Sequence, residues 1–379
     1  MRRPTPLWAS WKKLIVVSLS LGFTGCGTSS NRIVSPPVGS SVVAYQGTAS
    51  VGDFISITID HAARTITYDN HSNGTSGVAT YTVASDGSYT ITDPSGNFVT
   101  GFELPGFALV LQAQKSGPDG ATPSLVFAIL KEPFHKSDAV NANYNYMQFR
   151  TNSGGMELGA ALLDGAGNVR NEGYWPYGGA SNQESFMSGM FSTDLLQEDP
   201  SGNYLYLYNP GDLDTSYIFR TVGGVLAVDG DNGSHICMLQ QPSKDFSPSW
   251  AGSYGAILYM KENARTGPGN VETGDISFHR GNIAISASGI VTVTDQFGTE
   301  IVTTPLTPVA DDSTLVGPGK LQNDCPGLFA FSINRAGGRQ NVYVAFLNNA
   351  LLLSSFAYDP NTITSGGTYS YFYGVGLRK

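Results

Sequence analysis

The sequence has few charged residues and few cysteines for its length. Only 13% of its 379 residues are charged, about half the usual share, and only 3 are cysteines. Three cysteines exclude a disulfide-dense scaffold, and no apolar run reaches the ~20 residues that a membrane-spanning helix needs. Because 41% of the residues are hydrophobic, the chain can nevertheless build a core, which argues against wholesale disorder.

Glycine and proline, by contrast, are abundant, with 46 and 20 residues. Both weaken the interior of a helix, so long helices are not expected. The glycines follow no strict three-residue period, which excludes collagen.

The first 25 residues have the layout of a secretory leader. Arg2, Arg3, Lys12 and Lys13 form a cationic start, and an apolar run follows at 14–23. Removal of these four cations leaves 17 basic against 30 acidic residues. That excess of negative charge argues against a nucleic-acid partner.

The leader ends in Phe23-Thr24-Gly25-Cys26, which resembles the lipobox of bacterial lipoproteins, although that family usually has leucine at the position of Phe23. The resemblance implies that Cys26 is lipidated and becomes the mature N-terminus. The anchor and a flexible Ser/Thr/Pro/Gly tether then occupy 26–41. This implies an extracytoplasmic location in the cell envelope, on the outer membrane if the cell has one. An ordinary cleaved leader with a free Cys26 is the alternative.

Beyond residue 41 the dominant period of hydrophobicity is two. Ile55, Ile57 and Ile59 alternate with polar residues, and Val291 and Val293 alternate with threonines. Polar turns rich in Asp, Gly, Asn and Pro separate such segments. This pattern predicts an all-β chain of antiparallel meanders. One short helix is predicted at 181–191.

Several segments recur three times in the same order. The matching sets are the turns at Asp93, Asp199 and Asp295, the hairpins with His61 and His279, the turns Leu104–Ala108, Val222–Leu226 and Cys325–Phe329, and the strands Leu125–Leu130, His235–Leu239 and Val342–Leu347. Four strands with tyrosines at 45, 146, 254 and 371 mark the unit boundaries. The sequence therefore predicts three tandem units of about 110 residues each, at 42–149, 150–258 and 259–379.

Two packings of these units are compatible with the pattern. Either each unit closes into its own small barrel, as eight strands can, or each is a sector of one larger closed array. The strand Gly252-Ser253-Tyr254-Gly255 and the meander order resemble the calycin-type barrels, the lipocalin and streptavidin group. The resemblance implies barrel-like units, and both packings stay open.

Residues that recur in all units are expected to be architectural, which assigns Asp93, Asp199 and Asp295 to turns. His61 and His279 are expected at hairpin ends. The histidines lack the close spacing of a zinc site, and no metal or cofactor is predicted. No nucleophile elbow, Walker loop or dinucleotide fingerprint occurs.

The most distinctive local feature is an aromatic cluster on a glycine-flanked loop, Tyr174, Trp175 and Tyr177. Such side chains stack on sugar rings or on a protein partner; the alternative is a plug that caps its own sheet. Cys237 and Cys325 are expected either to form a disulfide or to remain two buried thiols.

The leading hypothesis is a lipid-anchored extracytoplasmic β-repeat protein that acts as a binding or scaffolding module for a glycan or a protein. One alternative is a glycan-directed surface hydrolase, which would need two carboxylates across a cleft. The candidates are Glu103, Glu132, Glu157 and Glu172, whose spacing selects no pair. A purely structural or adhesive surface protein is the other alternative.

Overall fold

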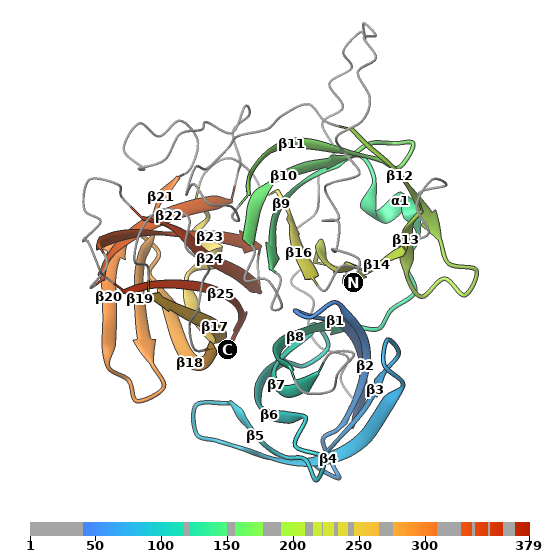
Figure 1. Cartoon of the computed structure of the whole chain (residues 1–379), viewed down its shortest axis with the longest axis horizontal. Coiled ribbons are helices and arrows are strands. Elements are labelled where there is room, and N and C mark those ends of the chain that lie inside the picture. The colour runs from blue at the N-terminus through green and yellow to red at the C-terminus, as the bar shows by residue number, and fades with distance from the viewer. Residues whose placement is uncertain are drawn as a thin grey trace, which may run out of the picture.

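The computed structural model describes most of the chain beyond residue 40. The described ranges are 41–116, 122–149, 156–176, 191–208, 215–221, 223–230, 234–241, 246–264, 276–308, 327–335, 338–347, 349–358 and 368–379. These residues form three antiparallel sheets arranged around a common centre (Figure 1). The all-β prediction with three tandem units is confirmed. The first two units close into separate barrels, and the third is a nine-stranded sheet.

Barrel 1 is a closed eight-stranded meander. Its strands are β1 (Val42–Ala49), β2 (Asp53–Asp60), β3 (Thr65–Asn70), β4 (Thr75–Val83), β5 (Tyr89–Thr92), β6 (Phe98–Leu104), β7 (Ala108–Ser116) and β8 (Thr122–Leu130). In β2 every second residue is buried, including Ile55, Ile57 and Ile59. These isoleucines point into the barrel and form its core with residues of the other strands.

Barrel 2 is also closed, with eight strands. They are β9 (Ala142–Phe149), β10 (Met156–Leu163), β11 (Asn168–Pro176), β12 (Phe191–Glu198), β13 (Leu205–Tyr208), β14 (Thr215–Thr221), β15 (Val225–Gly230) and β16 (Ser234–Gln240). The short helix α1 (Lys136–Ala139) connects it to barrel 1. The predicted helix at 181–191 lies outside the described residues except for Phe191, which begins β12.

The third sheet curls into a near-barrel of nine strands. They are β17 (Gly252–Ala264), β18 (Ile276–Ile285), β19 (Ile290–Asp295), β20 (Glu300–Pro305), β21 (Thr307–Pro308), β22 (Leu328–Arg335), β23 (Gly338–Leu347), β24 (Ala350–Tyr358) and β25 (Thr368–Arg378), preceded by the 3-10 turn η2 (Pro248–Trp250). The segment 300–308 pairs first with β19 and then with β22, and it bends at Leu306. Among the described residues no ladder joins β20 directly to β22.

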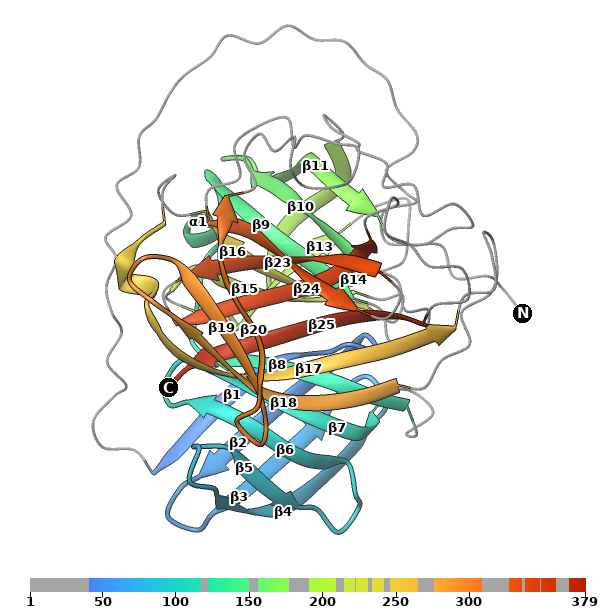
Figure 2. The same ribbon diagram turned by 90° about the vertical axis from the view of Figure 1, so that its left-hand side faces the viewer.

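The largest hydrophobic cluster lies between the three units. It collects residues from the outer faces of all three sheets, for example Phe127, Phe149, Phe219, Tyr259 and Leu352. The rings of Phe149 and Tyr373 stack there with their centroids 5.2 Å apart. Figure 2 shows β17 and β25 lying alongside β7 and β8. Strands at this centre are buried on both faces, and therefore the three units share one core.

Backbone hydrogen bonds at the closing strand define which residues of the three units are equivalent. The residue after the last strand donates to the first strand at 2.8 Å in each unit, from Lys131 to Ala44, from Gln241 to Asn143 and from Lys379 to Ser253. The next residues, Tyr45, Tyr144 and Tyr254, are therefore equivalent. Of the four predicted boundary tyrosines, Tyr146 was the wrong choice for the second unit. Tyr371 lies on the closing strand β25 rather than on a first strand.

The third copy of the predicted turn and strand repeat was also misplaced. The amides of Leu130, Gln240 and Arg378 donate to Phe107, Gly224 and Asn349. The turn at Asn349, rather than Cys325–Phe329, thus matches Leu104–Ala108, and β25, rather than Val342–Leu347, matches β8. The physical reason is that the β22–β23 hairpin makes the same local bond, from Phe346 to Gly327.

The aspartate turns have the expected role but are not equivalent. Asp93 accepts from the amides of Ser95 and Asn97, Asp199 from Ser201, and Asp295 from Phe297 and Thr299. They connect the fifth and sixth strands of barrel 1, the fourth and fifth of barrel 2, and the third and fourth of near-barrel 3. The same turn fits any tight hairpin, so its recurrence does not establish register.

The sheets also divide the chain at positions other than 149 and 258. The strand at 142–149 opens barrel 2 by pairing with β10 and β16, and the strand at 252–264 opens near-barrel 3. The leader, Cys26 and the tether lie outside the described residues. Within the described part, no helix is long and apolar enough to span a membrane.

Candidate functional site

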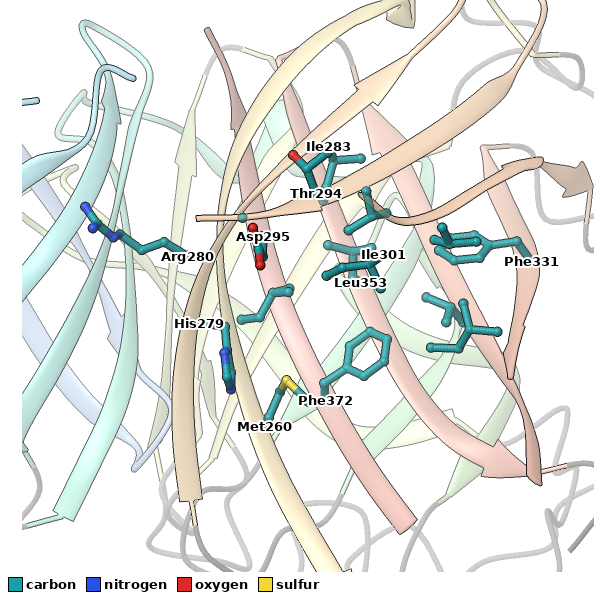
Figure 3. A pocket seen from close by; sticks show the side chains of 16 residues that line it. Met260, His279, Arg280, Ile283, Thr294, Asp295, Ile301, Phe331, Leu353 and Phe372 are labelled. Atoms are coloured by element: carbon teal, nitrogen blue, oxygen red, sulfur yellow. The ribbon is translucent and has the colours of Figure 1, made fainter. Parts of the chain in front are cut away.

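Near-barrel 3 contains a cavity of about 260 Å³. Apolar side chains make up most of its wall: Leu258, Met260, Ile283, Val293, Ile301, Val302, Phe331, Ile333, Val342, Leu353 and Phe372. They come from both halves of the sheet and converge on one space (Figure 3). The wall offers an apolar ligand close packing on several sides.

The register of the strands explains why this unit is hollow. Ile57 lies opposite Tyr45 in barrel 1, and Ile283 lies opposite Tyr254 in near-barrel 3. Counting from these partners, Gly281 takes the place of a buried isoleucine, Ile55. On the next strand, Val293 takes the place of Tyr68. An isoleucine side chain and a tyrosine ring are thus missing from this part of the wall.

The opposite end of near-barrel 3 is filled by aromatic rings. Trp250 is 2% exposed and stacks on Phe346 with the ring centroids 5.8 Å apart. Phe246 and Phe329 pack edge-on against Trp250, and the Tyr254 hydroxyl donates to the Trp250 carbonyl at 2.8 Å. The cavity is therefore closed at this end.

Four polar residues also lie at the cavity wall, namely His279, Arg280, Thr294 and Asp295. His279 is exposed, and its Nε2 lies 2.9 Å from the Ser277 hydroxyl. Asp295 accepts hydrogen bonds at 2.8 Å from the backbone N–H groups of Thr299 and Phe297, which hold the pKa of its carboxyl below the ordinary value. Asp295 is therefore an anion at neutral pH.

A β-bulge places Ile301 at the cavity. Val293 pairs with Val302 and Thr294 pairs with Glu300, so Ile301 has no partner of its own in the ladder. A bulge of this kind re-aims one side chain. Ile301 is 50% exposed and also lines the cavity, and it therefore marks where the cavity meets solvent.

In barrel 1 the end equivalent to the aromatic plug holds a buried polar cluster instead. The Glu103 side chain is fully buried and accepts hydrogen bonds from the hydroxyls of Tyr45 and Tyr89. His61 Nε2 lies 3.4 Å from the same carboxylate, and His61 Nδ1 lies 3.0 Å from the Tyr81 hydroxyl. Burial, followed by the Glu103 charge, raises the pKa of Tyr45 and Tyr89. The Glu103 side chain has no exposed surface, and we assign the cluster a structural role.

The position of Glu103 differs chemically in each unit. By ladder register, Glu103, Arg220 and Phe346 are equivalent. Each lies near the first-strand tyrosine of its own unit. Burial raises the pKa of Tyr144 to about 12, against the opposing effect of the Arg220 guanidinium. This one strand position is therefore occupied by an acidic, a basic or an aromatic side chain, depending on the unit.

Comparison with known proteins finds no matching family model and no matching curated protein. Among solved structures, intact Ap-TbpB with its N and C lobes matches 89% of this chain and 77% of its own, at 9% identity and a TM-score of 0.27. Isotype 1 transferrin binding protein B of serogroup B Neisseria meningitidis matches at 8% identity, 90% and 77% coverage and a TM-score of 0.19. AofleA of Arthrobotrys oligospora matches 88% of this chain and 89% of its own, at 11% identity and a TM-score of 0.16. Likenesses this low carry no argument about function.

The predicted aromatic ligand site is not tested. Tyr174 and Trp175 belong to β11, but their side chains lie outside the described part, as does all of Tyr177. Cys237 is a buried, free cysteine in the shared core, and burial raises the pKa of its thiol to about 12. Cys325 lies outside the described residues. Because Cys237 is free, the predicted disulfide between them is not seen, and Cys237 matches the alternative of a buried thiol.

The predicted pairing of His61 with His279 was wrong. His61 follows β2, whereas His279 lies within β18 at the position equivalent to Asp53. The two hairpins resemble each other only locally. Ladder register, rather than sequence spacing, decides which residues of two units are equivalent. Among the described residues, no group of three or more His, Cys, Asp or Glu side chains is placed to hold a metal.

The candidate carboxylates do not meet at the cavity. Glu103 is buried in barrel 1, and Glu132 lies in the connection before α1, where burial raises its pKa. The side chains of Glu157 and Glu172 are outside the described part. Asp295 is the one carboxylate among the described cavity residues. No pair suited to glycoside hydrolysis is therefore seen there.

Sequence reasoning missed the cavity residues, although one signal was available. Ile55, Ile57 and Ile59 form an unbroken inward row in β2, while the equivalent row of β18 reads His279, Gly281, Ile283 and Ile285. A glycine in an inward strand position removes a core side chain. Correct alignment of the units would have exposed that substitution.

Proposed function

We propose that the chain is a lipid-anchored, extracytoplasmic binding module that holds a small, mostly apolar molecule in near-barrel 3. The observation that carries this proposal is the cavity of about 260 Å³. A smaller apolar cavity of ~150 Å³ is known to bind small apolar molecules such as benzene. Ligand pockets generally begin near ~300 Å³, so the preferred ligand is small.

The predicted location supports the same role. If Cys26 carries the lipid, residues 27–41 form a tether that reaches at most ~50 Å. This tether would keep barrel 1 and its neighbours close to the bilayer. A binding module in that position could collect apolar molecules at the membrane or in the space beside it.

Filling the cavity tests the binding role. Val293→Phe restores at this position a ring like that of Tyr68, and we expect binding of the uncharged fluorescent probe N-phenyl-1-naphthylamine to weaken at least about tenfold, because the ring occupies the probe's space. Val83→Phe is the matched control, since Val83 is 56% exposed on barrel 1. Equal binding by both variants would contradict the proposal.

The anchor is tested separately. Cys26→Ser removes the predicted lipid attachment site, and we expect the protein to leave the membrane fraction on cell fractionation. Cys237→Ser serves as the control for loss of a cysteine at an unrelated site. Undiminished membrane partition of the Cys26→Ser protein would overturn the lipid anchor while leaving the cavity proposal intact.

A further inference from the structure

The polar end of the cavity carries information about its ligand. The apolar wall accepts a hydrocarbon body of any kind, so discrimination between ligands depends on the polar side chains of the wall. The polar residues at the wall are His279, Arg280, Thr294 and Asp295. The inference rests on the proposed function and concerns the chemistry of the ligand's polar group.

The cation among these residues is turned away. Figure 3 shows the Arg280 side chain extending away from the other cavity residues, towards barrel 1. Its Nη1 donates to the Ser88 hydroxyl at 2.8 Å, and it also interacts electrostatically with Asp86. The guanidinium therefore stabilises the contact between units and is not directed at a ligand in the cavity.

The charge that remains at the cavity is negative. Asp295 lines the wall, and its turn amides stabilise the ionised form. Glu300 is exposed and pairs with Thr294, but it is not among the described cavity residues. His279 is exposed, and its Nε2 lies 2.9 Å from the Ser277 hydroxyl.

We propose that the cavity takes an apolar molecule that ends in a protonated amine, with the ammonium group against the Asp295 carboxylate. A carboxylate retains lone pairs after accepting two backbone N–H groups, and a charge-assisted N–H···O bond is about twice as strong as a neutral one. An anionic head group would face Asp295 with Arg280 engaged elsewhere. A hydroxyl group could bond to Asp295 without the added charge attraction.

Three chain-matched ligands test the proposal on the purified full-length protein. Decylamine, decanol and decanoate share their carbon number and differ in charge. At pH 8 and low salt, each is titrated against bound N-phenyl-1-naphthylamine. We expect decylamine to displace the probe at a concentration at least about fivefold lower than decanol, and decanoate to be the weakest.

Asp295→Asn removes the charge while keeping an oxygen that can accept the turn amides. We expect this variant to bring decylamine within about twofold of decanol and to leave decanol unchanged, because only the charged bond is lost. Asp199→Asn is the matched control, since Asp199 accepts the Ser201 amide in the same kind of turn in barrel 2. That control should keep the preference for the amine.

The outcomes separate the two proposals. If decanoate binds as well as decylamine, or if Asp295→Asn retains the full amine preference, the amine inference is overturned while the cavity remains a binding site. The binding function itself fails if none of the three ligands displaces the probe. It also fails if the Val293→Phe variant binds the probe as tightly as the unmodified protein does. Loss of the amine preference only in Asp295→Asn supports the inference.

Discussion

Barrel 1 and near-barrel 3 begin with equivalent strands and have different interiors. In barrel 1, Ile55 and Tyr68 fill the space that Gly281 and Val293 leave open. At the other end, barrel 1 encloses the Glu103 cluster, and near-barrel 3 has the aromatic plug around Trp250. The difference teaches that one strand plan can support either a packed core or a binding cavity, according to a few inward positions.

The largest expected effect is at the polar cluster of barrel 1. Glu103→Ala leaves the buried hydroxyls of Tyr45 and Tyr89 without their acceptor, so we expect the free energy of unfolding to fall by about 3 to 5 kcal/mol. Urea unfolding followed by circular dichroism measures this. Glu300→Ala, at an exposed glutamate of near-barrel 3, should change stability by less than about 0.5 kcal/mol. A loss below about 1 kcal/mol for Glu103→Ala would mean that the cluster contributes little.

The next effect comes from hollowing barrel 1 to resemble near-barrel 3. Tyr68 packs edge-on against Phe98 and its hydroxyl accepts from the Asn97 amide. We expect Tyr68→Val to lower the free energy of unfolding by about 2 to 4 kcal/mol and to create a second site for N-phenyl-1-naphthylamine. Thr67→Val, at an exposed neighbour, is the control. Full stability in Tyr68→Val would refute the claim that Tyr68 fills barrel 1.

A smaller effect compares the same substitution in both interiors. Val293→Ile adds a methylene to the cavity and should raise the free energy of unfolding by up to about 0.8 kcal/mol. Val126→Ile adds it to the packed interior of barrel 1, where Val126 is fully buried, and should lower that energy by about 1 to 3 kcal/mol. Thermal unfolding of both variants gives the two signs. Equal signs would show that the two interiors are equally packed.

The smallest effect concerns pH. Because its turn amides lower the pKa of folded Asp295, the stability that this carboxylate contributes is present above the ordinary pKa of ~3.9 and is lost as pH falls below it. Asp295→Asn should therefore flatten the dependence of the free energy of unfolding on pH below about pH 4 and leave it unchanged above about pH 5. Urea unfolding between these pH values checks this. Identical slopes in the acid range would contradict the assignment.

Local sequence predicted the architecture because strand formation leaves a local signal. The alternation around Ile55, Ile57 and Ile59 identified an inward face, and Asp–Gly turns identified the connections. The threefold organisation followed from the repeated order of segments, whereas the sequence left open whether the units close separately or as one array. The lipid anchor at Cys26 and the aromatic loop at 174–177 stay predictions.

The site could not be read in the same way, because it depends on register. Turn sequences such as those of Asp93 and Asp199 recur on different hairpins, so aligning them shifted the units against one another. The cavity results from side-chain volumes summed over β17, β18, β19 and the returning strands. No single segment determines the volume of the cavity. The missing side chain at Gly281 opens a space only because Gly281 pairs with Ala256 and lines the same cavity as Val293.

The core that the three units share has a consequence for how the protein is made. A nascent chain that has completed only barrel 1 exposes the flank that includes Phe127 and Ile129, which is covered by its siblings in the finished molecule. The units must therefore mature together, because the apolar flank of the first barrel stays exposed until the later strands, including β25, have formed. Removal of any one unit would expose the apolar flanks of the other two to solvent.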